Sequence, residues 1–183
     1  MIRAEWKTTR LWLRPVASRD EKAVLTAFSD PNVTRWLVRV PTPYVPAEFK
    51  DFVENLAHPG QTFAIDDGTG MVGGIELSDE LGYWIAPWAQ GKGYAREAAR
   101  AVLAAWFAQS GDPVRAHHLD DNLRSARLLA SLGFLETGRG AGTLGVPSRP
   151  LRWVNVELTK SGWILAQNPV DPPNAAPSQQ SKA

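Results

Sequence analysis

The sequence predicts an α+β fold, with a central mixed, mostly antiparallel sheet flanked by about four helices. Segments with the two-residue period of strands alternate with segments of helical period. Their order is strand, two helices, a meander of strands, helix, strand, helix and a final strand pair. A glycine-rich turn at 67–70 marks one antiparallel hairpin directly. This order of elements is typical of the α+β class.

The N-terminal part is expected to supply one strand and two helices. Residues 9–15 alternate as a strand that proline stops. Ser18 and Glu21 have the spacing of a capping box, in which hydroxyl and carboxylate each satisfy a backbone N–H at a helix start. The helix that follows is expected to end at Asp30-Pro31. Apolar spacing predicts a second helix over about 46–57, terminated by a His-Pro-Gly sequence.

The middle and C-terminal parts supply the remaining elements. Residues 62–66 and 71–77 read as apolar strands on either side of the glycine-rich turn. A further strand is expected over 81–86, and a long helix with one apolar face over 94–110. The last elements are a strand over 114–119, a helix capped by Asp121 or Asn122 that stops at Gly133, and two strands over 134–137 and 151–158 around a glycine-rich connection.

Composition excludes several classes of protein. The chain has 20 Lys and Arg residues against 19 Asp and Glu residues, a balance that speaks against a dedicated nucleic-acid binder. Because it contains no cysteine, disulfide scaffolds, zinc ribbons, iron–sulfur clusters and thiol nucleophiles are excluded. No run approaches the roughly 18 apolar residues of a membrane span, and the N-terminus lacks the apolar core of a signal peptide. We therefore expect a cytoplasmic protein that binds neither nucleic acid nor membrane.

The length of 183 residues suits one domain with a sizeable core. Four prolines and few large apolar residues make 168–183 a poor candidate for a core element. We expect a single domain over 1–167 and a flexible, proline-rich C-terminal tail over 168–183.

The segment between the strand at 81–86 and the long helix carries the clearest chemical signal. Backbone N–H groups at a helix start lack partners and lie at the positive end of the helix dipole. Gly91 and Gly93 would let a phosphate approach them closely. The alternative is a tight strand-to-helix turn that needs glycine only for its backbone conformation. The spacing matches neither a P-loop nor a Rossmann dinucleotide fingerprint.

Four motifs in order make the chain resemble the GNAT superfamily of N-acetyltransferases, over residues 8–163. They are Gln90-x-x-Gly93-x-Ala95, the preceding Leu81-Gly-Tyr-Trp-Ile, the later Asn122-x-x-Ser125 followed by Gly133-Phe134, and an opening with Thr9-Arg10-Leu11 and Ser29-Asp30-Pro31. The opening is similar to that of the branch containing the ribosomal-protein alanine and serine acetyltransferases.

The resemblance implies a fold and a cofactor. Two parallel strands, 81–86 and 114–119, would splay apart and expose backbone groups to the pantetheine arm of acetyl-CoA. The pyrophosphate would lie on the amides that follow the first strand, and a backbone N–H near Ile85 would stabilise the oxyanion. The residues expected to bind the cofactor are Trp84, Ile85, Gln90, Gly91, Lys92, Gly93, Tyr94, Ala95, Asn122 and Ser125. No metal is implied.

Catalytic roles follow from the same resemblance. Glu80 is the first candidate to deprotonate the amine, directly or through water, with a solvated surface glutamate as the alternative reading. Glu76 on the neighbouring strand is the alternative candidate for this role. Ser125 is the candidate to protonate the leaving thiolate, unless it only bonds backbone in its helix. The tyrosine that many members carry seven residues after the asparagine is replaced by Leu129. A tyrosine acid at that position is therefore excluded.

The acceptor would be an amine held by residues on the walls of the cleft. Candidates for substrate binding are Trp36, Tyr44, Glu76 and Trp153, although core packing explains aromatic residues equally well. His117 and His118 face opposite sides of a strand and cannot share one metal.

The sequence thus predicts an acetyl-CoA-dependent N-acetyltransferase acting on a protein N-terminal or small-molecule amine. The alternative is a non-catalytic acyl-CoA-binding or interaction module of the same fold. Edge pairing of the strand at 151–158 would allow a homodimer.

Overall fold

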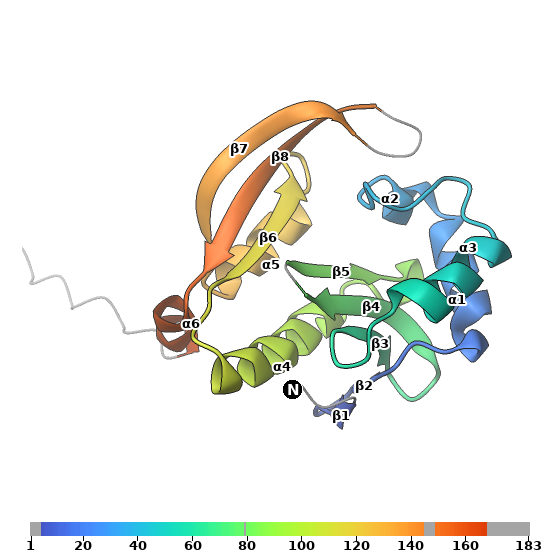
Figure 1. Cartoon of the computed structure of the whole chain (residues 1–183), viewed down its shortest axis with the longest axis horizontal. Helices are drawn as coiled ribbons and strands as arrows, with labels where there is room; N and C mark the ends of the chain where they lie inside the picture. Colours follow the sequence, from blue (N-terminus) through green and yellow to red (C-terminus); the bar gives the residue numbers. More distant parts are fainter. Residues whose placement is uncertain (1–4, 79, 145–148, 168–183) are drawn as a thin grey trace, which may run out of the picture.

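The computed structural model describes residues 5–78, 80–144 and 149–167, which form two antiparallel sheets with helices packed against them (Figure 1). The first sheet has the order β1 (Trp6–Lys7), β2 (Trp12–Arg14), β3 (Thr62–Asp66), β4 (Met71–Leu77) and β5 (Leu81–Ile85). The second has the order β6 (Val114–Leu119), β8 (Arg149–Leu158) and β7 (Leu135–Leu144). The proline-rich segment expected to form a tail over 168–183 lies outside the described residues.

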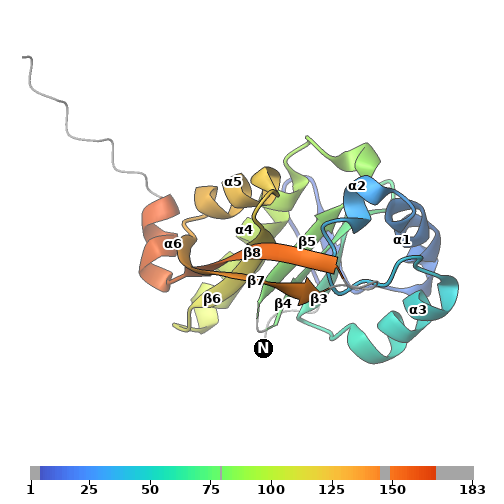
Figure 2. The same cartoon turned by 90° about the horizontal axis from the view of Figure 1, so that it is seen from above.

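Six α-helices in this part of the chain divide between two regions. They are α1 (Glu21–Phe28), α2 (Pro31–Thr34), α3 (Pro46–Asp51), α4 (Tyr94–Gln109), α5 (Leu123–Ser131) and α6 (Lys160–Gln167). A π-helical segment, Phe52–Leu56, continues α3, and single 3₁₀ turns lie at Ser18–Asp20 and Pro87–Ala89. Helices α1 to α3 lie together at one end of the molecule, and α4 to α6 lie beneath and beside the sheets (Figures 1 and 2).

Two hydrophobic cores correspond to these two regions. The larger one joins both sheets to α4, α5 and α6, with Leu103, Leu129 and Leu158 almost fully buried. The smaller one packs α1, α2 and α3 against β3 and β4 around Phe28 and Phe49. Each core is built from one face of its helices, as their apolar spacing predicts.

The two sheets meet at a single isolated bridge, in which Glu80 and Arg115 pair in parallel. The predicted α+β class, mostly antiparallel pairing and a splayed parallel strand pair are confirmed, while the expected central sheet is divided in two at this point. Beyond the bridge, β5 and β6 diverge and form no further ladder.

Several predicted element bounds need correction. The carboxylate that caps the first helical turn is Asp20, which accepts from the Ala17 N–H at 2.9 Å, and not Glu21. Asp30-Pro31 ends α1 as expected but also begins α2, because the Asp30 carboxylate accepts from the Asn32 N–H at 2.8 Å.

The glycine-rich connection expected between the last two strands is largely strand. Residues through Leu144 pair with β8, so β7 and β8 form a long hairpin arm over the rest of the molecule (Figure 1). Helix α6 was not predicted, and its Trp163 packs in the larger core at 6.1 Å from the Phe107 ring. No helix in the described ranges is long and apolar enough to cross a bilayer.

A buried ion cluster joins the N-terminal strand to the first sheet. The Arg14 guanidinium, 2 % exposed, donates to Asp20 at 2.8 Å and to Asp66 at 2.9 Å. The hydrogen bond with Asp20 is the main reason why the pKa of Arg14 is raised above its ordinary value. Three charged groups are stable here because each side chain is paired within the cluster.

A second contact ties the N-terminal segment to the start of α4. The Glu97 carboxylate accepts from the Thr8 hydroxyl at 2.6 Å and from the Arg10 backbone and side chain at 2.8 and 2.7 Å. Arg10 also donates to the Lys92 carbonyl at 2.9 Å. Burial alone would raise the pKa of Glu97, but these hydrogen bonds outweigh it and leave the pKa below its ordinary value.

Replacing Arg14 by methionine should destabilise the protein by about 3–5 kcal/mol, because two buried carboxylates would lose their counter-charge. Urea unfolding measures the change. Arg19→Met, at an exposed neighbouring position, is the matched control and should stay within about 0.5 kcal/mol. Equal effects of both substitutions would contradict the assignment of the cluster.

Glu97→Gln should destabilise the protein most near neutral pH. A carboxylate with a lowered folded pKa contributes stability above its unfolded pKa and loses it as the pH falls through the folded pKa. The difference in unfolding free energy between wild type and variant should therefore shrink below about pH 4. Glu54→Gln, in an exposed pair with Lys50 at 3.9 Å, serves as control. If wild type and Glu97→Gln differ in unfolding free energy by the same amount near neutral pH and below about pH 4, this account is refuted.

Candidate functional site

The site is built around the opening between β5 and β6. The Ala86 N–H donates to the Val72 carbonyl at 2.9 Å, so alternate residues of this segment direct their backbone groups toward β4. By the same alternation, Tyr83 and Ile85 direct theirs toward the opening. The Ile85 carbonyl accepts from Gln90 Nε2 at 3.2 Å. The opening therefore offers backbone donors and acceptors like those of a free sheet edge.

The loop between β5 and α4 has the conformation expected of an anion cradle. Gly91 and Gly93 have φ values of +78° and +80°, which residues with a Cβ rarely adopt. Gly93 is the N-cap of α4, and no side chain caps this helix. The first N–H groups of a 16-residue helix, beginning at Tyr94 and Ala95, thus follow a glycine that has no side chain to block them.

Polar contacts hold both rims of this loop. Arg10 binds the Lys92 carbonyl on one side, and its guanidinium lies 5.0 Å from the centre of the Tyr94 ring. On the other side, Arg124 donates to Gln90 Oε1 at 2.8 Å and links the loop to α5. Three positive side chains, Arg10, Lys92 and Arg124, therefore surround the uncapped helix start.

Ser125 lies in the first turn of α5 and is fixed by two neighbours. Its N–H donates to Asn122 Oδ1 at 3.2 Å, so Asn122 is the helix cap. Its hydroxyl is 2.8 Å from the Tyr83 hydroxyl, which crosses from β5. Burial raises the pKa of Tyr83 to about 12, so the phenol stays protonated near neutral pH. Ser125 is thus directly connected to the strand that borders the opening.

Glu80 occupies the closed end of the opening. Its Oε2 is 3.0 Å from His117 Nδ1 and 3.6 Å from Arg39 Nη2. The side chains of both Glu80 and His117 are 36 % exposed, so water reaches the pair.

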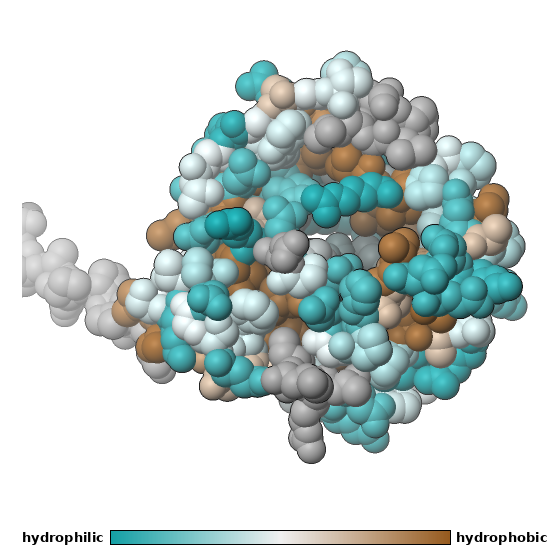
Figure 3. Space-filling view, viewed as in Figure 1, coloured by the Kyte–Doolittle hydropathy of each residue, from teal (hydrophilic) through white to brown (hydrophobic). Residues whose placement is uncertain are grey.

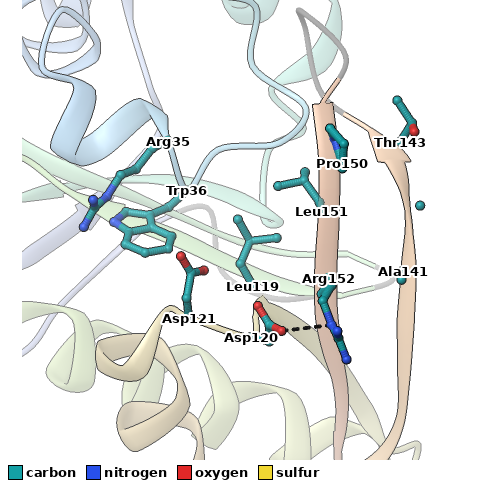
Figure 4. Close-up of a pocket in the computed structure, with 11 residues that line it drawn as sticks. Arg35, Trp36, Leu119, Asp120, Asp121, Ala141, Thr143, Pro150, Leu151 and Arg152 are labelled. Atoms are coloured by element: carbon teal, nitrogen blue, oxygen red, sulfur yellow. Dashed lines mark ion pairs between the residues drawn. The ribbon is translucent and has the colours of Figure 1, made fainter.

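A cavity of about 650 Å³ lies beyond the end of β6, between the segment after α2 and the hairpin arm (Figure 4). Trp36 and Arg35 border it on one side, and Arg35 stacks on the Trp36 ring at 4.2 Å. Asp120 and Asp121 line its lower part, and Asp120 pairs with Arg152 of β8 at 3.3 Å. The space-filling view shows the molecule hollowed between the arm and α2 (Figure 3). The cavity thus combines an aromatic wall with two carboxylates.

Trp153 of β8 packs its ring against β7, the edge strand of the arm. A Cβ built on Gly140 would come within 2.3 Å of the Trp153 ring, and one on Gly142 within 3.5 Å. Trp153 also lines a smaller cavity of about 230 Å³ with Asp120 and Arg152. Glycine in β7 is therefore required by this indole ring.

Trp36 and Trp153 are the predicted site residues that line these two cavities, whereas Trp84, Tyr44 and Glu76 have contacts elsewhere. The Trp84 side chain packs in the smaller core, 4.8 Å from the Phe28 ring, so its expected part in cofactor binding stays a prediction. Tyr44 packs on Phe28 at 5.0 Å, and burial first, then Glu48 and Asp51, raises its pKa to about 12. Glu76 on β4 accepts from the Ser78 hydroxyl at 3.1 Å.

Sequence reasoning missed the long-range partners of the site. Arg10 and Arg124 hold the loop, Tyr83 holds Ser125, and Asp120 and Asp121 line the larger cavity. Strand alternation could have found Tyr83, two positions before Ile85, and Asp121 was considered only as a cap. No group of three or more histidine and acidic side chains suited to a metal ion is present among the residues that the structure describes.

Comparison with known proteins gives consistent results. A curated relative from Bacillus subtilis, the uncharacterized N-acetyltransferase YoaA, is 29% identical over 155 residues, covering 72% of this chain and 83% of the relative. Spermidine N-acetyltransferase from Vibrio cholerae, solved with CoA and spermine, superimposes with a TM-score of 0.72 at 20% identity, over 86% of this chain and 99% of that one. Ribosomal-protein-S5-alanine acetyltransferase from Vibrio fischeri gives a TM-score of 0.65 at 20% identity, over 87% and 98%.

The two solved acetyltransferase structures share the fold of this chain at a sequence identity of 20%. The family model for the acetyltransferase (GNAT) domain matches residues 10–135, which include the glycine loop, α4 and Ser125. The chain therefore belongs to the GNAT acetyltransferase family.

Proposed function

We propose that this protein transfers the acetyl group of acetyl-CoA to a primary amine, either a protein N-terminal amine or an amine of a small molecule. The observation that carries the proposal is the opening between β5 and β6, which ends at the uncapped start of α4. An amide-rich arm can pair with the exposed backbone of β5, as an added strand would. The phosphates that follow it fit the N–H groups and positive side chains around Gly93.

The residues around the opening can support direct attack of the amine on the thioester. The Ile85 N–H, on the side of β5 that faces the opening, would donate to the developing oxyanion. Ser125 would give a proton to the departing thiolate, with its hydroxyl oriented by Tyr83. A group at the Glu80 end of the opening would accept the proton of the attacking ammonium.

The acceptor would enter through the cavity between Trp36 and the arm. Its carboxylates at Asp120 and Asp121 suit an ammonium group, and the Trp36 face suits the carbon chain beside it. Asp120 already pairs with Arg152, whereas Asp121 lines the same cavity one residue before the cap of α5. We therefore assign Asp121 to recognition of the amine.

Titration calorimetry tests the cofactor. Acetyl-CoA should bind wild type in the micromolar range, and Gly93→Val should weaken binding at least tenfold, because a β-branched residue at a φ of +80° distorts the loop. Gly111→Val, at a glycine without positive φ or nearby atoms, is the matched control. Absence of binding by folded wild type would refute the proposal.

Turnover tests the reaction itself. Wild type is assayed for CoA release with spermidine and with a hexapeptide carrying N-terminal alanine, since these represent the two acceptor classes. Acetylated product from either amine supports the proposal. Acetyl-CoA binding without any product would instead favour a non-catalytic acyl-CoA-binding module.

Asp121→Asn should raise the KM for the accepted amine about tenfold and leave acetyl-CoA affinity unchanged, because this carboxylate is assigned to the acceptor ammonium and lies away from the glycine loop assigned to the cofactor. Steady-state kinetics measure the change. Asp112→Asn, at the far end of α4, is the control and should match wild type. A loss of acetyl-CoA affinity in Asp121→Asn would contradict the assignment of the cavity to the acceptor.

A further inference from the structure

The Glu80 carboxylate has a histidine side chain beside it. His117 lies on β6, and its Nδ1 is 3.0 Å from Glu80 Oε2. A carboxylate only accepts hydrogen bonds, so the proton of the neutral imidazole is on Nδ1. Nε2 is then the free acceptor of the ring.

The register of the strands sets His117 on the side of the acceptor. Side chains two residues apart on a strand point to the same face, so Arg115, His117 and Leu119 share one face of β6. Leu119 lines the larger cavity, and Arg115 forms the bridge with Glu80. His117 therefore lies two residues along β6 from Arg115, at the closed end of the opening, and two residues from Leu119, at the cavity.

The space beside His117 is open on the β5 side. On β5, Gly82 lies two residues beyond the bridge at Glu80, as His117 on β6 lies two residues beyond the bridge at Arg115. Gly82 carries no side chain, and a Cβ built there would meet nothing within 4 Å. With the imidazole 36 % exposed, water has room between this ring and the opening.

We infer that His117 accepts the proton of the acceptor ammonium through its Nε2, and that Glu80 is the positioning residue which holds the imidazole. The inference rests on the proposed acetyl transfer. The ammonium gives one proton through water to Nε2, and the resulting amine forms the N–C bond to the acetyl group. The C–S bond then breaks, the thiolate takes one proton from Ser125, and the second proton of the nitrogen passes through water to restore the Ser125 hydroxyl. His117 releases its proton to solvent.

Other charged groups on this side of the sheets have partners of their own. They are Arg39 after α2, Glu76 on β4, Arg115 on β6 and Glu157 on β8, in addition to Glu80. Arg39 binds the same oxygen of Glu80, Arg115 pairs with Glu157 at 3.7 Å, and Glu76 accepts from Ser78. Among the described contacts, Glu80 is the one charged group that hydrogen-bonds the imidazole.

The test compares kcat at saturating amine as a function of pH in wild type, His117→Gln, Glu80→Gln and His118→Gln. The probe is spermidine or the alanine hexapeptide, whichever wild type acetylates. Wild type should lose activity on the acid side of neutrality, where imidazoles become protonated. His117→Gln should lower kcat about 100-fold and abolish this acid limb, while acetyl-CoA affinity by calorimetry stays unchanged.

Glu80→Gln should lower kcat about tenfold and keep an acid limb, because the imidazole is present but less well oriented. His118→Gln is the matched control: its Nδ1 bonds the Leu119 carbonyl at 2.8 Å, on the opposite face of β6. It should retain wild-type kcat and pH profile. Added imidazole should partly restore His117→Gly, a readout that a structural role would not produce.

Wild-type kcat and an unchanged acid limb in His117→Gln would overturn the inference while leaving the proposed function intact. A greater loss in Glu80→Gln than in His117→Gln, with the acid limb abolished only in the former, would also overturn it and make Glu80 the base itself. Failure of wild type to acetylate any amine concerns the proposed function, and the calorimetric and turnover assays detect it separately.

Discussion

The single parallel bridge between Glu80 and Arg115 is the constraint on which the rest of the structure depends. Two strands that were paired along their whole length would use their backbone groups on each other. Here they separate after one bridge, so Tyr83 and Ile85 keep donors and acceptors for another molecule. An opening of this kind is stable only if solvent or a ligand satisfies those groups.

Side-chain contacts hold the borders of the opening where no ladder does. Arg10 fixes the glycine loop to the first sheet, Arg124 fixes it to α5, and Tyr83 fixes α5 to β5. Each contact joins elements that are far apart in the chain. The geometry of the cofactor side is therefore determined by a few polar pairs and by the large core beneath them.

The sequence predicted the locally determined parts of the fold well. The bounds of β3, β4 and β6 agree with the predicted ranges, because alternation and a glycine turn are local signals. Helix α2 has only four residues, too few for a periodic pattern. The part of the arm after residue 137 was read as a connection because glycine disfavours strands, yet Gly140 is needed in β7 for the Trp153 ring to pack on it.

The candidate site shows the same difference between features set by local sequence and features set by long-range contacts. Gln90, Gly93, Asn122 and Ser125 could be chosen as candidates because they belong to compact motifs within a few residues of one another. The pairing of Glu80 with His117 could not, since nothing in two separate strands reveals the register in which they meet. The residues of the proposed acceptor cavity were the hardest to predict, because the cavity is assembled from the segment after α2, the end of β6 and the tip of the arm.

The division of the molecule into two hydrophobic cores has a consequence for how such an enzyme changes over evolutionary time. The glycine loop leads into α4, which packs in the larger core. Trp36 instead follows α2, which packs in the smaller core. Mutations that reshape the Trp36 side of the proposed acceptor cavity can therefore accumulate without disturbing the packing under α4. A lineage built on this plan can change the amine it recognises while its handling of the donor is inherited unaltered.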